Sequence, residues 1–155
     1  MAHQQPRHYF GRAHSALTAT IVLMTVAVAV TALVSFLPAL ATNPDPVRLA
    51  EEWLSHIDTN RYSDSWATAS SYLKQQIQEG QWTRTLTSHR QPFGPVLSRQ
   101  HHKTERRTNL PNVPKGEYAV LYFATSFTHK RDALETVVMF QESNGLWKAI
   151  GYTIK

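Results

Sequence analysis

The chain has 155 residues, which is the size of one domain, and 42% of them are hydrophobic, enough for a packed core. It contains no cysteine, which excludes a disulfide framework, a thiolate metal site and a thiol nucleophile. The formal net charge of +5 at pH 7 points to acidic partners and makes the distribution of the basic residues important.

The N-terminal part of the chain has the pattern of an export segment. Residues 16–37 carry no charged side chain and are long enough to cross a bilayer as a helix. Arg7 and Arg12 precede this run without any acidic residue, which by the positive-inside rule places the following domain outside the cytoplasm. Ala39-Leu40-Ala41 has the small residues that signal peptidase requires, so we expect a signal peptide over 1–41, cleaved after Ala41.

The length of the hydrophobic run keeps a second interpretation open. It exceeds the usual signal-peptide core of about 7–15 residues, which favours an uncleaved transmembrane anchor at about 16–37. In the first case residues 42–155 are a periplasmic domain, and in the second the same domain faces the periplasm from the inner membrane. Either placement argues against a nucleic-acid partner, and it limits membrane contact to the N-terminal segment.

Helical periodicity follows the export segment. Asp45 and Pro46 are typical of a helix cap and a first helical position, and the pattern ends near Asp58. We expect a second helix over 63–79 with Gly80 as its stop, and a short third helix over 82–89. The apolar residues of these helices that we predict to be in the core include Ala50, Trp53, Leu54, Ile57, Trp66, Leu73 and Trp82.

The period changes to that of strands after the stiff turn at 91–95. β-branched and aromatic residues predict strands, joined by the loop 108–116 and by a hairpin loop at 143–145. The predicted strands are 96–107, 117–128, 133–142 and 146–154. Helices followed by strands indicate an α+β fold, in which N-terminal helices pack on a four-stranded antiparallel sheet.

Basic residues concentrate in residues 84–107. This segment carries six Lys and Arg against one acid, whereas residues 45–83 carry three against six. The asymmetry predicts a surface for an anionic partner, either an acidic envelope protein or a lipid, although an edge strand guarded against aggregation has the same pattern. Since edge charges contribute little to stability, we expect their removal to be tolerated. The residues of this predicted anionic-partner surface are Arg84, Arg90, Arg99, Lys103, Arg106 and Arg107.

Many spaced residues of the domain resemble one bacterial family. They include Ala50-x-x-Trp53-Leu54-x-x-Ile57-Asp58, Tyr62-x-x-Ser65-Trp66, Arg90-x-Pro92-x-Gly94, Glu135-Thr136-Val137 and Gly145-x-Trp147-x-x-x-Gly151-Tyr152. Over about 46–155 the chain resembles domain-of-unknown-function family 4019. The resemblance implies an exported domain with a cystatin-like or nuclear-transport-factor-like α+β roll, and it implies no activity.

No residue pattern in the sequence is specific for catalysis, a metal or a cofactor. The histidines lack ligand spacing, and no serine has the frame of a nucleophile. Cone-shaped rolls that act as enzymes use acidic and tyrosine side chains inside the cone, which makes Asp58, Tyr62 and Glu135 the candidates for a small-molecule-binding or enzymatic cavity. We favour a non-catalytic module that binds a partner or ligand in the cell envelope.

The export interpretation predicts how the protein is processed. Expressed in a Gram-negative host, the protein should be recovered from the periplasm with Thr42 at its N-terminus, because Ala41 ends the predicted cleavage site. Intact-mass measurement of the periplasmic and membrane fractions distinguishes the forms. A full-length chain in the membrane would establish the anchor, and a chain confined to the cytoplasm would contradict export.

Overall fold

A group of helices precedes an antiparallel sheet in the computed structural model, which describes residues 44–155. The helices are α2 (Pro46–Asp58), α3 (Tyr62–Thr68), α4 (Ser71–Gln76) and α5 (Glu79–Arg90), followed by the 3-10 turn η1 (Gln91–Phe93). The strands are β1 (Val96–Arg107), β2 (Tyr118–Phe127), β3 (Ala133–Gln141) and β4 (Trp147–Ile154), in the order β1-β2-β3-β4. All neighbouring strands are antiparallel, which confirms the α+β prediction.

The predicted export segment and its cleavage site after Ala41 lie outside the described residues. Within the described part of the chain, none of the helices combines the length and the apolar character that crossing a membrane requires.

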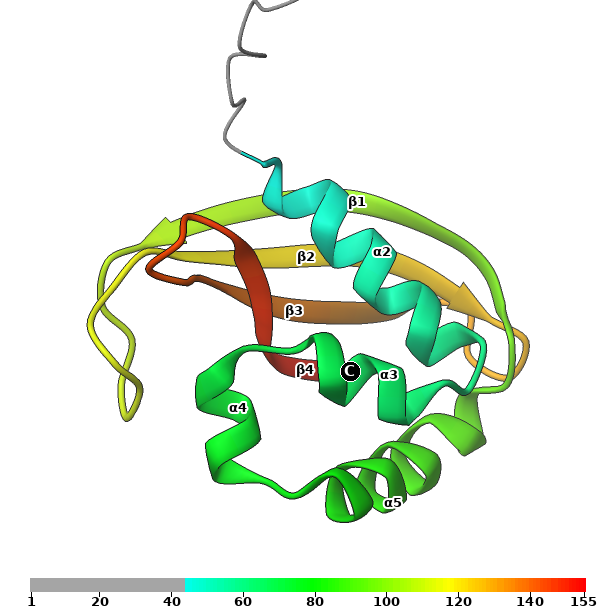
Figure 1. Cartoon of the computed structure of the whole chain (residues 1–155). Coiled ribbons are helices and arrows are strands. Elements are labelled where there is room, and N and C mark those ends of the chain that lie inside the picture. Colours follow the sequence, from blue (N-terminus) through cyan, green and yellow to red (C-terminus); the bar gives the residue numbers. More distant parts are fainter. Residues whose placement is uncertain (1–43) are drawn as a thin grey trace, which may run out of the picture. The chain divides into compact units, whose positions relative to one another are not determined.

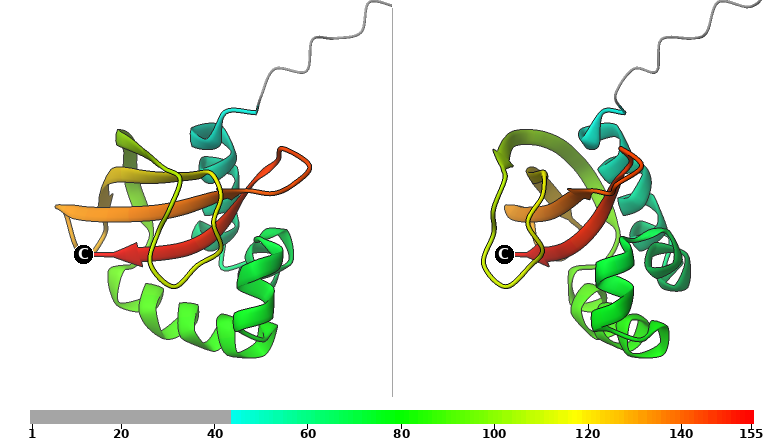
Figure 2. Two further views of the ribbon diagram at one scale, coloured as in Figure 1. Left: turned by 90° about the vertical axis from the view of Figure 1, so that its left-hand side faces the viewer. Right: turned by 60° about the vertical axis from the view of Figure 1, so that its left-hand side comes forward.

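The helices lie against one face of the sheet (Figures 1 and 2). Helix α2 crosses the strands diagonally and contacts β2, β3 and β4, while α4 reaches β4. Helix α5 packs mainly against α3 rather than on the strands. The sheet therefore has one face covered by helices, and the C-terminal end of α2 meets the part of the chain where α5 turns into β1 (Figure 1).

Helix α2 forms as its sequence predicts. The side chain of Asp45 caps it by accepting a hydrogen bond of 3.0 Å from the amide of Val47, and Pro46 occupies the first turn. Its apolar stripe of Ala50, Trp53, Leu54 and Ile57 is buried against the sheet. The last helical residue, Asp58, consequently lies at the edge of the core.

The predicted helix over 63–79 is wrong, because the chain breaks between α3 and α4 and again before α5. Ser70 causes the first break: its amide donates to the carbonyl of Ala149 on β4 at 2.9 Å, and its hydroxyl caps α4 by accepting from the amide of Leu73. Gly80 is not a stop but lies in the first turn of α5. A partner from the far end of the chain decides the break, so helical periodicity gave no sign of it.

Two tryptophans meet at one buried serine. The indole of Trp53 donates to the carbonyl of Ser65 at 2.8 Å, and that of Trp82 donates to the Ser65 hydroxyl at 2.9 Å. The two rings lie 6.3 Å apart. Trp66 is only partly buried, and its indole donates to the carbonyl of Ile77. The core prediction is therefore confirmed for Trp53 and Trp82, whereas Trp66 lies at the margin of the core.

Strand β1 contains two irregularities, one near its start between Val96 and Ser98 and a second, a bulge after His101, that reverses its faces. The pairing with β2 moves from His101 opposite Phe123 to Lys103 opposite Tyr122, so one residue is inserted. Arg99 therefore faces the helices, whereas Lys103 and Arg107 face the other side. Without the bulge, strict alternation would place all three on one face.

The burial of the tryptophans predicts unequal costs of truncation. Trp82→Ala should lower the free energy of unfolding by about 3–5 kcal/mol, because it removes a buried ring and leaves the Ser65 hydroxyl without its donor. Trp66→Ala should cost clearly less, since part of that ring is already in water. Urea unfolding of both variants measures the difference, and equal losses would refute this description of the core.

Candidate functional site

Arg99 joins the end of α2 to the middle of the sheet. Its Nη1 and Nη2 lie 2.6 and 2.9 Å from the two carboxylate oxygens of Asp58, and its Nε lies 2.6 Å from Glu135. Glu135 is 0% exposed and Arg99 13% exposed, so the charges meet largely out of water. Burial lowers the pKa of Arg99, but the hydrogen bonds to both carboxylates outweigh this and raise it above its ordinary value. The guanidinium is therefore a permanent link between helix and sheet.

Glu135 also gathers hydrogen-bond donors from two neighbouring strands. It accepts a hydrogen bond of 2.6 Å from the hydroxyl of Thr125 on β2 and one from the hydroxyl of Tyr152 on β4. Burial raises the pKa of Tyr152, and the nearby Glu135 raises it further, so this hydroxyl stays a donor. The buried carboxylate thus has donors on three sides.

Arg90 is bound less completely than Arg99. Its side chain is 5% exposed; Nη1 donates to the carbonyl of Gly94 at 3.1 Å, and Nη2 lies 3.5 Å from Asp58. The guanidinium lies 4.5 Å from the ring centre of Phe127. Its Nε has no hydrogen-bond partner. Arg90 is therefore a buried cation with one unused donor, which is uncommon in a folded protein.

An open cavity of about 550 Å³ lies beside Arg90, and we call it the Arg90 cavity. Its lining comes from the turn after α2, from one face of α5 and from η1. The lining residues are Asp58, Asn60, Tyr62, Thr83, Thr87, Arg90, Gln91, Gly94 and Pro95. Polar residues thus outnumber apolar ones in the lining, which includes the ion pair of Asp58 and Arg90, although more of the exposed lining surface is apolar than polar.

A polar stripe of α5 supplies one wall of the Arg90 cavity. Thr83, Thr87 and Arg90 are spaced by four and three residues, which places them on one side of a helix. The buried Oγ1 of Thr83, like Nε of Arg90, has no partner. On the opposite wall the hydroxyl of Tyr62 donates to Asn60 at 2.8 Å. The pKa of Tyr62 is raised above its ordinary value, mainly by burial. The nearby charge of Arg90 lowers this pKa, and that of Asp58 raises it.

The family model described as a protein of unknown function, DUF4019, matches residues 49–152. The chain belongs to this family. The match contains all four residues of the buried ion cluster, Asp58, Arg90, Arg99 and Glu135, and it confirms the resemblance found in the sequence. The family description assigns no activity, and the search of the curated proteins found no match.

The DUF4019 domain brings together only part of the predicted cavity set. Asp58 and Tyr62 line the Arg90 cavity, whereas Glu135 lies behind Arg99 and does not line it. In the described part of the chain no group of three or more His, Asp or Glu side chains is arranged to hold a metal ion.

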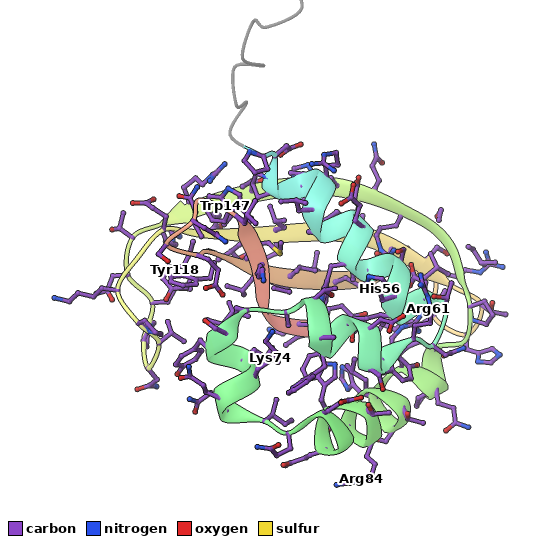
Figure 3. All side chains as sticks on the ribbon, viewed as in Figure 1. His56, Arg61, Lys74, Arg84, Tyr118 and Trp147 are labelled. Atoms are coloured by element: carbon purple, nitrogen blue, oxygen red, sulfur yellow. The ribbon has the colours of Figure 1, made fainter. Side chains whose placement is uncertain are left out.

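The six residues of the predicted anionic-partner surface do not share one surface. Arg90 and Arg99 are 5% and 13% exposed and belong to the internal ion cluster, so Arg99 is not the exposed edge charge that its position in the sequence suggested. Lys103 and Arg107 both pair with Glu105 on the outer face of the sheet. The remaining two are on other elements or faces: Arg84 points away from the strands on α5 (Figure 3), and Arg106 lies 4.7 Å from the ring centre of Trp147.

Sequence reasoning missed the hydroxyl and amide residues of the cavity. The spacing of Thr83, Thr87 and Arg90 was a usable signal, because it marks a polar stripe on a helix. Asn60 carried a weaker signal in the sequence, because an asparagine after a helix end often adopts a positive φ. In the structure its φ is 59°.

The ion cluster predicts different roles for two arginines of one strand. Arg99→Met should lower the free energy of unfolding by about 3–5 kcal/mol, because it leaves the carboxylate of Glu135 buried without its cation. The matched control Arg107→Met removes an exposed pair and should cost at most about 1 kcal/mol. Equal effects in denaturant unfolding would show that Arg99 is an ordinary edge charge.

Proposed function

We propose that this DUF4019 domain is exported and works in the periplasm as a non-catalytic module of the cell envelope that binds a ligand in the Arg90 cavity. The observation that carries the proposal is the cavity itself, which lies beside the ion pair of Asp58 and Arg90 and is lined by the polar side chains of Asn60, Thr83, Thr87 and Gln91.

The properties of the cavity support a binding role. Small-molecule sites usually have volumes of about 300–1,000 Å³, and 550 Å³ lies within this range. The side chains of Asn60, Thr87 and Gln91 in its lining offer a ligand both hydrogen-bond donors and acceptors.

The ion cluster supports binding rather than catalysis. General acid-base catalysis needs a group that can exchange a proton with the substrate. Both oxygens of Asp58 accept from Arg99, and Glu135 is enclosed by Arg99, Thr125 and Tyr152. These carboxylates position the arginines and are not free to exchange protons with a substrate. Ligand binding is therefore better supported than catalysis as the function of the cavity.

The finer fold and the location belong to the same proposal. An antiparallel sheet with helices on one face fits a cystatin-like roll. The uncharged run 16–37 and the small residues before Thr42 support export, with the anchored form as the other possibility. On β1, Glu105 offsets part of the charge of Lys103 and Arg107, so we place the site in the cavity and not on that strand.

Blocking the cavity tests the proposal. Two-dimensional amide NMR spectra of the protein purified from the periplasm should change at the cavity residues Asn60, Thr83 and Gly94 when the low-molecular-weight fraction of an envelope extract is added. Thr87→Trp should abolish these changes, because an indole at this lining position fills space that the ligand needs.

The matched control is Thr85→Trp, an equal substitution at an exposed position of the same helix that does not line the cavity. It should leave the spectral changes intact. Absence of changes at the cavity, or equal loss in both variants, would contradict ligand binding at this place.

A further inference from the structure

We infer that the protein forms a symmetric dimer, in which Leu146 of each copy inserts into an apolar groove of the other copy. This inference goes beyond the proposed function and is independent of it, since the groove shares no lining residue with the Arg90 cavity.

The groove lies between α2 and the β3–β4 hairpin, and we call it the hairpin groove. Its volume is about 240 Å³, which is large enough for a leucine side chain. Most of its wall is apolar and comes from α2 and the sheet, and all but one of these apolar side chains belong to the buried core. They are Leu49, Trp53, Met139, Trp147 and Ala149. The hairpin groove is therefore an opening onto the hydrophobic core.

Leu146 is an exposed apolar side chain at the rim of this groove. It is 45% exposed, one of three large hydrophobic residues that are exposed within residues 44–155. It lies at the end of the β3–β4 hairpin loop, and this hairpin projects from the sheet beside α2 (Figure 2). Apolar surface that is contiguous and rimmed by polar residues is typical of a protein–protein interaction site.

The two walls of the hairpin groove carry opposite charges. Glu52 lies on the α2 wall with 58% of its side chain exposed, and its ion-pair partner is Arg48 on the same helix. Lys148 lies on the β4 wall and has no ion-pair partner among residues 44–155. The groove thus has an acidic side chain on one side and an unpaired basic one on the other.

This combination is complementary to itself, which favours a second copy over an unrelated protein. A two-fold axis that runs along the groove places the α2 wall of one copy opposite the hairpin wall of the other. Leu146 then meets the groove of the second copy, and Glu52 meets its Lys148. Each contact occurs twice, so one patch of the chain supplies both halves of the interface.

Sedimentation velocity over a range of concentrations tests the dimer, with the protein purified from the periplasm. The parent should dimerise reversibly. Leu146→Asp should be monomeric, because its carboxylate would have to enter an apolar groove. The matched control is Leu97→Asp, at a leucine on β1 that is 53% exposed and does not line the groove, and it should dimerise as the parent does. Both leucines are exposed, so thermal unfolding should show that both variants remain folded.

Charge reversal tests the two-fold arrangement. Glu52→Lys and Lys148→Glu should each weaken the dimer about tenfold, because the symmetric interface contains this pair twice and each variant makes both pairs repulsive. The double variant Glu52→Lys with Lys148→Glu should restore the affinity, because it exchanges the two charges and keeps the pairing.

Several results would overturn the inference. A parent that stays monomeric at every concentration would do so, even if Leu146→Asp abolished its binding to another envelope protein, since the groove would then belong to a different partner. A dimer that Leu146→Asp leaves intact would place the interface elsewhere. Equal loss in both aspartate variants would reflect added charge and not a contact of Leu146. Failure of the double reversal to restore the affinity would refute the pairing of Glu52 with Lys148 and the symmetric dimer built on it.

Discussion

The guanidinium of Arg99, held between Asp58 and Glu135, is the contact on which the arrangement of helices and sheet depends. It connects the last residue of α2 to β3 by way of β1, three elements far apart in the sequence. A buried ion pair is not a strong source of net stability, because desolvation offsets most of the attraction. Its effect is on geometry: in other positions of α2 the guanidinium of Arg99, which is 13% exposed, would lose its contacts with Asp58. The apolar stripe of α2 could pack on the sheet in several positions, whereas the contact of Asp58 with Arg99 fixes one of them.

The same contact explains why Arg90 is paired less completely than Arg99. Asp58 uses both oxygens for Arg99, at 2.6 and 2.9 Å, and so holds Arg90 only at 3.5 Å. Arg90 is fixed mainly by Gly94 and by the ring of Phe127, and its Nε is left over. Beside the cavity, the carboxylate of Asp58 therefore binds Arg99 closely and Arg90 only weakly. The other polar residues of the lining are uncharged.

The sequence predicted the parts of the fold that depend on local patterns. The Asp45 cap, the stripe of α2 and the four strands in consecutive antiparallel order follow from periodicity and turn residues. The break at Ser70 and the bulge after His101 depend on partners in other strands, which local patterns do not contain. The bulge had the largest consequence, since it determines which way the charged residues of β1 point.

The candidate site was predictable to a similar extent. Asp58 and Tyr62 were named as cavity candidates because cone-shaped rolls that act as enzymes use acidic and tyrosine side chains inside the cone, and both line the Arg90 cavity. Arg90 and Arg99 were recognised as basic, but net charge along a segment does not show which side chains are buried. Only the folded arrangement reveals that these two belong to an internal cluster and that Thr83 shares a cavity with Arg90.

The Nε–H resonances of the two arginines provide the most direct test of the difference between Arg99, whose donors are paired with two carboxylates, and Arg90, whose Nε has no partner. In a ¹H–¹⁵N spectrum of the domain, the Nε–H of Arg99 should appear well downfield and exchange slowly with water, because it donates to a buried carboxylate at 2.6 Å. The Nε–H of Arg90 should lack this downfield shift, because it has no acceptor. A downfield, slowly exchanging signal for Arg90 together with an ordinary one for Arg99 would contradict the account.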